Sequence, residues 1–147
     1  MTIYQRQTEK PGTRITRRAS GAVTVNRFVK INGAQASVLG ERVIGVSYDS
    51  ALDTELIGVT VDGSALVMCG AVALGVGAEV TTDANGKAVQ ARAGQFGAGI
   101  VLNAANPGEL VEILLGSAKR VVTPVTSTTT TTSTTTSTTT TTTTTAP

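Results

Sequence analysis

The stretch from Gly97 to Leu115 constrains the fold most, because it has the pattern of a strand, a turn and a second strand. Asn106-Pro107-Gly108 is typical of a type II turn, since proline presets φ at the first central position and glycine accepts the positive φ of the second. Residues 110–115 then alternate with the two-residue period of a strand, and Glu112 is the clearly polar residue among them. We therefore predict a strand buried on nearly both faces, on which a small all-β body closes.

Shorter strand patterns precede this pair and are separated by turn residues. Apolar and β-branched runs predict strands near residues 27–31, 42–48, 56–61, 64–68, 79–82 and 87–90. Asp62-Gly63 between two of these runs predicts a hairpin with a type I′ turn, and residues 83–86 predict a second hairpin with a longer loop. Short strands at this spacing, without a convincing helical pattern, predict an all-β barrel or sandwich.

The two ends of the chain differ from this body in composition. Residues 1–20 are polar and basic, and residues 13–18 have Ile15 as their strong apolar side chain, which predicts a disordered or extended arm that adds a strand to something else. Threonine supplies 18 of the 25 residues in 123–147, which predicts a tail that is disordered alone but pairs into a short fibre when three copies are held together. The predicted domains are thus an arm (1–20), an all-β domain (21–118) and a Thr/Ser-rich tail (119–147).

The composition limits how stable the body is by itself. Hydrophobic residues make up 40% of the chain, but aromatic residues only 3%, and tryptophan is absent. The core must therefore consist of Val, Ala, Leu and Ile, which predicts a thin core and marginal stability as a monomer. Association with copies of itself or with a larger surface would supply the missing stability.

The formal net charge of +2 hides an uneven distribution along the chain. Residues 1–30 carry seven Lys or Arg against one acid, a net charge of +6, whereas residues 31–116 carry three against nine acids, a net charge of −6. This split predicts that the arm docks on an acidic partner, which is a neighbouring copy, another protein or a nucleic acid. The candidate binding residues are Arg14, Ile15, Arg17 and Arg18, with a solvated terminus as the alternative. Nucleic acid is disfavoured because no aromatic platform or recognition helix accompanies the arginines.

Residues that carry out chemistry are scarce, and we expect neither catalytic residues nor a bound cofactor or metal ion. Histidine is absent and Cys69 is the single cysteine, so the chain provides neither a disulfide nor a cysteine–histidine zinc site. Cys69 follows an apolar run and is expected to be a buried, inert thiol. The acids stand mostly at turns, where carboxylates accept hydrogen bonds from backbone amides. A signal peptide is not expected, because the N-terminus lacks an apolar h-region. A membrane span is not expected either, because the uncharged stretch 63–78 is short and broken by glycines.

The order and spacing of five segments resemble the capsid decoration (cement) proteins of tailed bacteriophages. The resemblance covers roughly residues 13–116 and is carried by residues 21–30, 43–47, 59–67, 80–89 and 99–115. It implies a β-tulip or jelly-roll-like fold, no catalytic residues, a homotrimer, and a place on the outer capsid surface, where the major capsid protein is the partner. It also implies that residues 13–19 reach onto the major capsid protein or an adjacent cement subunit.

Two functions follow from these observations. The first is a structural cement that binds the outer surface of a phage head and stabilises capsomer contacts, in which many weak contacts add up by avidity. The alternative is a fibre or adhesive module on the virion surface, in which the threonine-rich tail attaches to a host or another surface.

Overall fold

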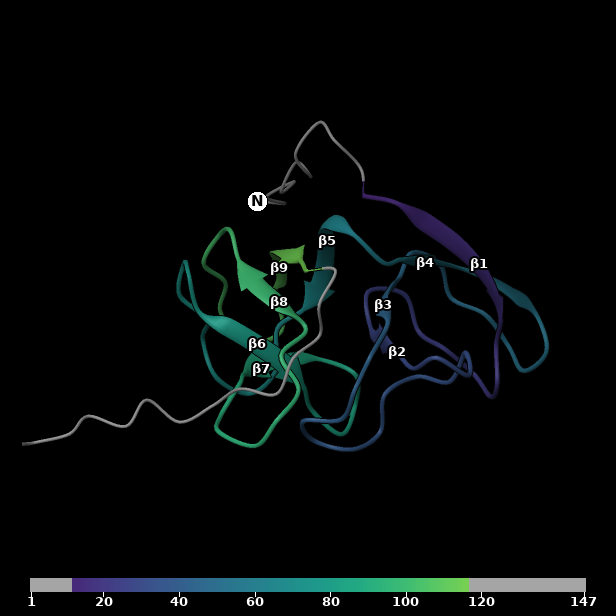
Figure 1. Ribbon diagram of the computed structural model, residues 1–147, viewed down its shortest axis with the longest axis horizontal. Coiled ribbons are helices and arrows are strands. Elements are labelled where there is room, and N and C mark those ends of the chain that lie inside the picture. Colours follow the sequence, from purple (N-terminus) through teal and green to yellow (C-terminus); the bar gives the residue numbers. More distant parts are fainter. Residues whose placement is uncertain (1–11, 117–147) are drawn as a thin grey trace, which may run out of the picture.

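The computed structural model describes residues 12–116, and within this range the chain forms nine β-strands and no helix (Figure 1). In chain order these are β1 (Arg14–Arg18), β2 (Phe28–Val29), β3 (Gly45–Ser47), β4 (Leu56–Thr60), β5 (Gly63–Met68), β6 (Glu79–Thr82), β7 (Ala88–Gln90), β8 (Gly99–Val101) and β9 (Leu110–Leu115). The predicted all-β class is confirmed. The part of the predicted arm before Gly12 lies outside the described residues, and so does the threonine-rich tail.

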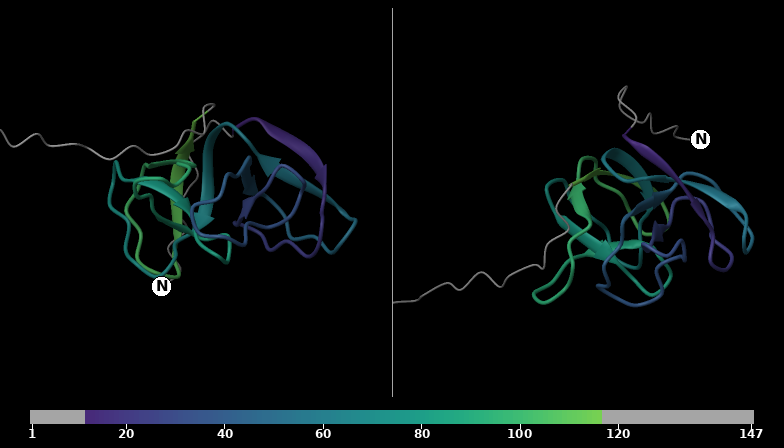
Figure 2. Two further views of the ribbon diagram at one scale, coloured as in Figure 1. Left: turned by 60° about the horizontal axis from the view of Figure 1, so that its bottom comes forward. Right: turned by 45° about the vertical axis from the view of Figure 1, so that its right-hand side comes forward.

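The nine strands form two antiparallel sheets. One sheet has the order β1-β4-β3-β2, and the other has the order β5-β9-β8-β6-β7. Figures 1 and 2 show the two sheets as two halves lying side by side, with the chain passing from one to the other between β4 and β5. The predicted sandwich-like architecture is therefore confirmed, whereas its assignment as a β-tulip stays a prediction.

Strand β9 and the turn before it have the structure that the sequence predicts. The amide of Glu109 donates to the carbonyl of Asn106 over 3.1 Å, and Gly108 has a φ of 82°, as a type II turn requires. β9 then pairs with β8 on one side and β5 on the other. Its residues Val111, Glu112, Ile113 and Leu115 are buried, so the strand is nearly enclosed on both faces.

The hairpin predicted around residues 83–86 is also confirmed. β6 and β7 pair in antiparallel register, with Val80 opposite Gln90. The carboxylate of Asp83 accepts hydrogen bonds from the amides of Asn85 and Lys87, both over 2.8 Å. This carboxylate therefore organises the turn, as the sequence predicts for acids at turn positions.

The prediction of a hairpin at Asp62-Gly63 is wrong. Strand β4, before the turn, pairs with β1 and β3, whereas β5, after it, pairs with β9 in the other sheet. Gly63 does have a positive φ of 79°, but Asp62 is not among the residues with positive φ, so a type I′ turn is not formed. β4 already has a neighbour on each side, and the Asp-Gly pair instead marks the crossing between the sheets.

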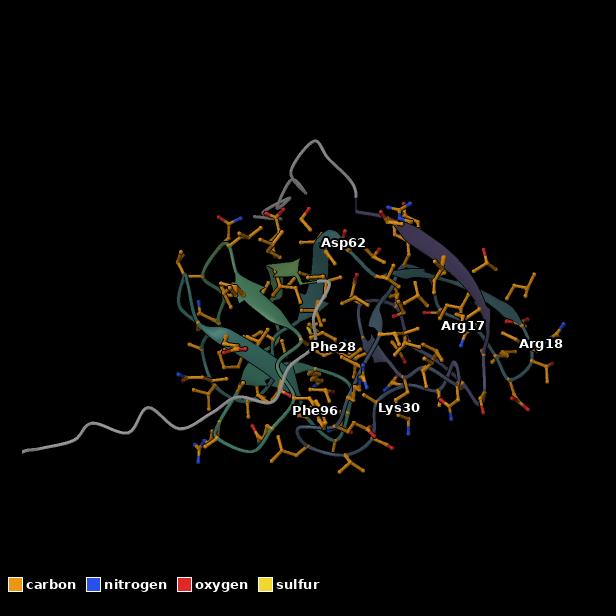
Figure 3. All side chains as sticks on the ribbon, viewed as in Figure 1. Arg17, Arg18, Phe28, Lys30, Asp62 and Phe96 are labelled. Carbon is orange, nitrogen blue, oxygen red and sulfur yellow. The ribbon has the colours of Figure 1, made fainter. Side chains whose placement is uncertain are left out.

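Small aliphatic side chains fill two separate clusters of the core. The larger cluster contains Phe28, Val46, Val67 and Ile113, and so joins strands of both sheets. Phe28 is fully buried, as predicted, and lies between the two halves of the molecule (Figure 3). The smaller cluster lies on the four-stranded sheet and consists of Ala19, Val23, Val29, Ala51, Ile57 and Val59. A body whose core is divided in this way has little apolar area to stabilise either part.

Candidate functional site

The described part of the predicted arm is a strand of the chain's own four-stranded sheet. Ile15 and Thr16 are β-branched and favour extended backbone, and Arg14 to Arg18 pair with Thr60 to Leu56 of β4 in antiparallel register. The sequence predicts that this segment is either disordered or an extended arm that adds a strand to something else. The difference arises because β4, which is distant in the chain, presents an edge to which this weakly apolar segment adds.

Contacts with the body hold the three arginines of β1 in place. The guanidinium carbon of Arg14 lies 3.5 Å from the centre of the Tyr48 ring, which is a cation–π contact. A side-chain nitrogen of Arg18 donates to the carbonyl oxygen of Thr54 over 2.9 Å, and one of Arg17 donates to the carbonyl oxygen of Ile31. Arg14, Arg17 and Arg18 thus lie on a paired strand and contact the body, while Arg14 and Arg18 are also exposed to solvent.

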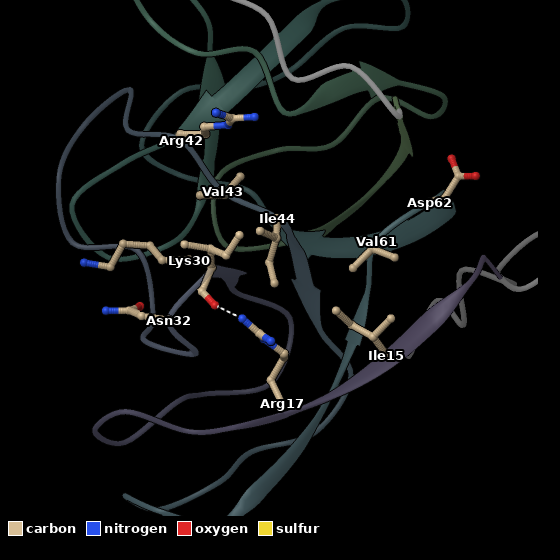
Figure 4. A pocket seen from close by; sticks show the side chains of 10 residues that line it. Ile15, Arg17, Lys30, Asn32, Arg42, Val43, Ile44, Val61 and Asp62 are labelled. Carbon is tan, nitrogen blue, oxygen red and sulfur yellow. Dashed lines mark hydrogen bonds between the residues drawn. The ribbon is translucent and has the colours of Figure 1, made fainter.

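Two side chains of β1, Ile15 and Arg17, face a groove of about 790 Å³ on the four-stranded sheet (Figure 4). Figure 4 shows both side chains pointing from β1 toward Val61 and Ile44, while Lys30 lies on the far side of the groove. The residues that line the groove are Ile15, Arg17, Lys30, Ile31, Asn32, Arg42, Val43, Ile44, Val61 and Asp62. Because residues that follow one another on β1 point to opposite faces, Arg14 and Arg18 lie on the other face of the strand.

The groove combines an apolar floor with a positive rim. Arg17, Lys30 and Arg42 line it against the single acid Asp62, whereas the described residues 12–116 as a whole carry eight Lys or Arg against nine acids, a net charge of −1. Lys30 is partly neutralised by Glu41, whose carboxylate lies 3.7 Å from the lysine nitrogen. Ile31 is 70% exposed and Ile15 38% exposed, so apolar surface is available beside the charges. Such a surface suits an acidic partner that also carries aliphatic side chains.

Sequence reasoning identifies one wall of this groove and misses the other. Ile15 and Arg17 are predicted to bind a partner, and both line the groove. Lys30, Arg42 and Asp62 are not predicted there, because strand pairing between distant segments brings them together. The one local signal for this second wall is Ile31, an apolar residue directly before the Asn32-Gly33 turn, which the structure leaves exposed.

The described residues do not form a cluster of three or more side chains suited to hold a metal ion. Cys69 is fully buried, as predicted, and its thiol donates to the carbonyl oxygen of Val72 over 3.3 Å. Burial raises the pKa of the Cys69 thiol, so the group stays protonated and unreactive at neutral pH. Between residues 12 and 116 we find no helix with the length and apolar character needed to span a bilayer.

An all-β body with a partly apolar, cation-lined groove is typical of a binding module, and comparison with known proteins identifies its family. The model of the phage cement protein family matches residues 7–117, which include all nine strands. The chain therefore belongs to the phage cement protein family, a family of structural proteins. This confirms the resemblance found in the sequence, and places the protein in the virion, on the exterior of the capsid.

A solved structure supports the fold assignment. The N base of head fiber gp8.5 in bacteriophage phi29 matches with a TM-score of 0.59 and 20% sequence identity, over 74% of this chain and 97% of that chain. At this level of identity the similarity is one of fold. No curated protein matches the chain.

Proposed function

We propose that this cement protein attaches to the outer face of the head through β1 and the groove beside it, and that its partner there is the major capsid protein. The observation that carries the proposal is the charge pattern: a partly apolar groove lined by Arg17, Lys30 and Arg42 lies on a body whose net charge is close to zero. A partner with exposed acids and aliphatic side chains satisfies both features of the groove. Binding neighbouring capsid subunits at once would stabilise the contacts between them.

The small core supports a further part of the proposal, that the protein acts as a homotrimer. Phe28 is the largest fully buried side chain, and the remaining core side chains are mostly Val, Ala, Leu and Ile. Assembly into a trimer adds buried area to a body of this kind and multiplies the capsid contacts of each particle. Sedimentation equilibrium tests this: a mass three times the 14.9 kDa of the single chain is expected, and a mass of one chain contradicts it.

Charge reversal in the groove tests the capsid-binding role. We expect the double variant Arg17→Glu with Arg42→Glu to bind purified heads that lack this protein at least about tenfold more weakly than the wild type, because both rim cations become acids. The double variant Lys87→Glu with Arg92→Glu is the matched control, since it changes the net charge by the same amount and neither residue lines the groove. Binding of the groove variant within about twofold of the control would show that the groove is not the contact surface.

The threonine-rich tail supports a second candidate function, a fibre or adhesive element on the virion. Its composition, 18 threonines in 25 residues, is unlike that of the body, and a protein of similar fold is the base of a head fiber. Removing residues 123–147 separates the two functions. Loss of particle stability in the truncated virion supports a cementing role for the tail, whereas loss of host adsorption alone supports the fibre.

A further inference from the structure

Strand β1 borders the groove through Ile15 and Arg17, and the edge of β1 that is turned away from β4 offers backbone hydrogen-bonding groups to which no strand of the described residues pairs. The bonds from the amide of Val61 to the carbonyl of Thr13 and from the amide of Ala19 to the carbonyl of Glu55 fix which residues bond to β4. In an antiparallel pair these residues alternate along the strand, so Ile15 and Arg17 direct their backbone groups toward β4. The amides and carbonyls of Arg14 and Thr16 therefore point away from β4, at the outer edge of the sheet.

The loop after β2 lies along this same edge at the end of β1. The amide of Ser20 donates to the carbonyl oxygen of Gly33 over 3.2 Å, and a Cβ on Gly33 would lie only 2.0 Å from the carbonyl oxygen of Arg18. The edge is therefore already covered at its C-terminal end. Toward the N-terminal end of β1, this loop and the strand enclose the groove. The Arg17 side chain crosses the groove to reach the carbonyl of Ile31 (Figure 4).

We propose that an extended segment of the capsid partner adds to this edge as a further strand and bonds to the backbone of Arg14 and Thr16. This inference rests on the proposed function and specifies how its site binds. The groove separates β1 from residues 30–32. An exposed strand edge beside such a groove can accept a further strand, because its outward backbone groups can bond to an extended segment.

The side chains on the two faces of β1 specify the chemistry of the added strand. Residues directly opposite each other in a sheet share a face, so partner residues opposite Ile15 point into the groove, toward Ile44 and Val61. Aliphatic side chains suit those positions. Partner residues opposite Arg14 and Thr16 lie on the other face, where an acid would pair with Arg14. The occupant is thus an extended protein segment in which acidic and aliphatic residues alternate.

A proline at position 16 tests the proposal, because it removes an amide that faces outward and leaves the bonds to β4 in place. We expect Thr16→Pro to fold but to bind heads lacking this protein at least about tenfold more weakly than the wild type. Thr16→Val is the matched control, since it keeps the backbone amide and should bind as the wild type does. Equal binding of the proline and valine variants, in a protein that does bind heads, would overturn strand addition while the proposed function stands.

Hydrogen exchange of the wild-type chain tests the same inference without any substitution. On binding to heads, the amides of Arg14 and Thr16 should gain protection, whereas those of Ile15 and Arg17 are already protected by β4. Protection of Arg14 and Thr16 in the free protein that rises with its concentration would identify a second copy as the occupant. Protection that is lost when residues 1–11 are removed would identify the chain's own arm. Either result contradicts the proposal, and failure of the wild type to bind heads would instead contradict the proposed function.

Discussion

At the scale of single residues, Gly33 determines how closely β1 and the loop after β2 approach each other. Its φ of 86° lies in the region that favours glycine, and its Cα packs against the carbonyl of Arg18. The sequence shows Asn32-Gly33 as a turn, but not the second requirement at this position, which is space. That requirement comes from Arg18, a residue far from the turn along the chain.

The substitution Gly33→Ala should therefore destabilise the body more than its backbone angle alone accounts for. Gly21 has the same φ of 86°, but a Cβ added there would meet nothing within 4 Å, so Gly21→Ala measures the cost of the angle, about 1 to 2 kcal/mol. Gly33→Ala adds a clash with backbone and should lower the free energy of unfolding by about 1 kcal/mol more. Urea unfolding of the two variants measures this difference, and equal losses would show that the loop moves aside freely.

At the scale of elements, β9 is predictable from sequence because its determinants are local. The type II turn needs only Pro107 and Gly108, and the alternation after it is visible in residues 110–115. The chain around Gly63 shows what a local signal cannot predict. The Asp-Gly pair indicates that the chain changes direction, but it does not indicate whether the next strand pairs with the preceding one. The pairing of β1 with β4 is not predictable for the same reason, because the partner edge is supplied by distant residues.

The central place of β9 predicts a large difference between two adjacent substitutions. Ile113 is fully buried in the larger core cluster, so Ile113→Ala should cost about 2 to 5 kcal/mol of the free energy of unfolding. Leu114 points to the opposite face and is 46% exposed, and Leu114→Ala should cost less than about 1 kcal/mol. Denaturant unfolding followed by circular dichroism distinguishes them, and similar losses for both would contradict the packing of β9.

At the scale of the whole molecule, the small core and the charge of the groove both favour a protein that works bound to a partner. A thin, divided core favours use of the protein in an assembly, and a positive groove on a body of nearly zero net charge limits where a partner can dock. Half of the groove is predictable from the sequence. Its β1 wall consists of Ile15 and Arg17, which the sequence marks as candidate binding residues, whereas Lys30 and Arg42 join them only through the sheet pairing.

This arrangement predicts a binding affinity that depends on salt. Raising the ionic strength from about 0.05 M to 0.5 M should weaken binding to heads about tenfold or more, because the exposed rim charges are screened. The double variant Arg17→Glu with Arg42→Glu should show a clearly smaller salt dependence. Affinity that does not change with salt in the wild type would indicate that the apolar part of the groove, and not its charge, selects the partner.

The orientation of the protein on the particle tests the central claim most directly. A cryo-electron microscopy map of decorated heads, at a resolution that separates strands, should show the body on the capsid exterior with β1 and the groove against the shell. It should also show density for an added strand beside Arg14 and Thr16. A map in which β1 and the groove face the solvent, away from the capsid, would contradict the account.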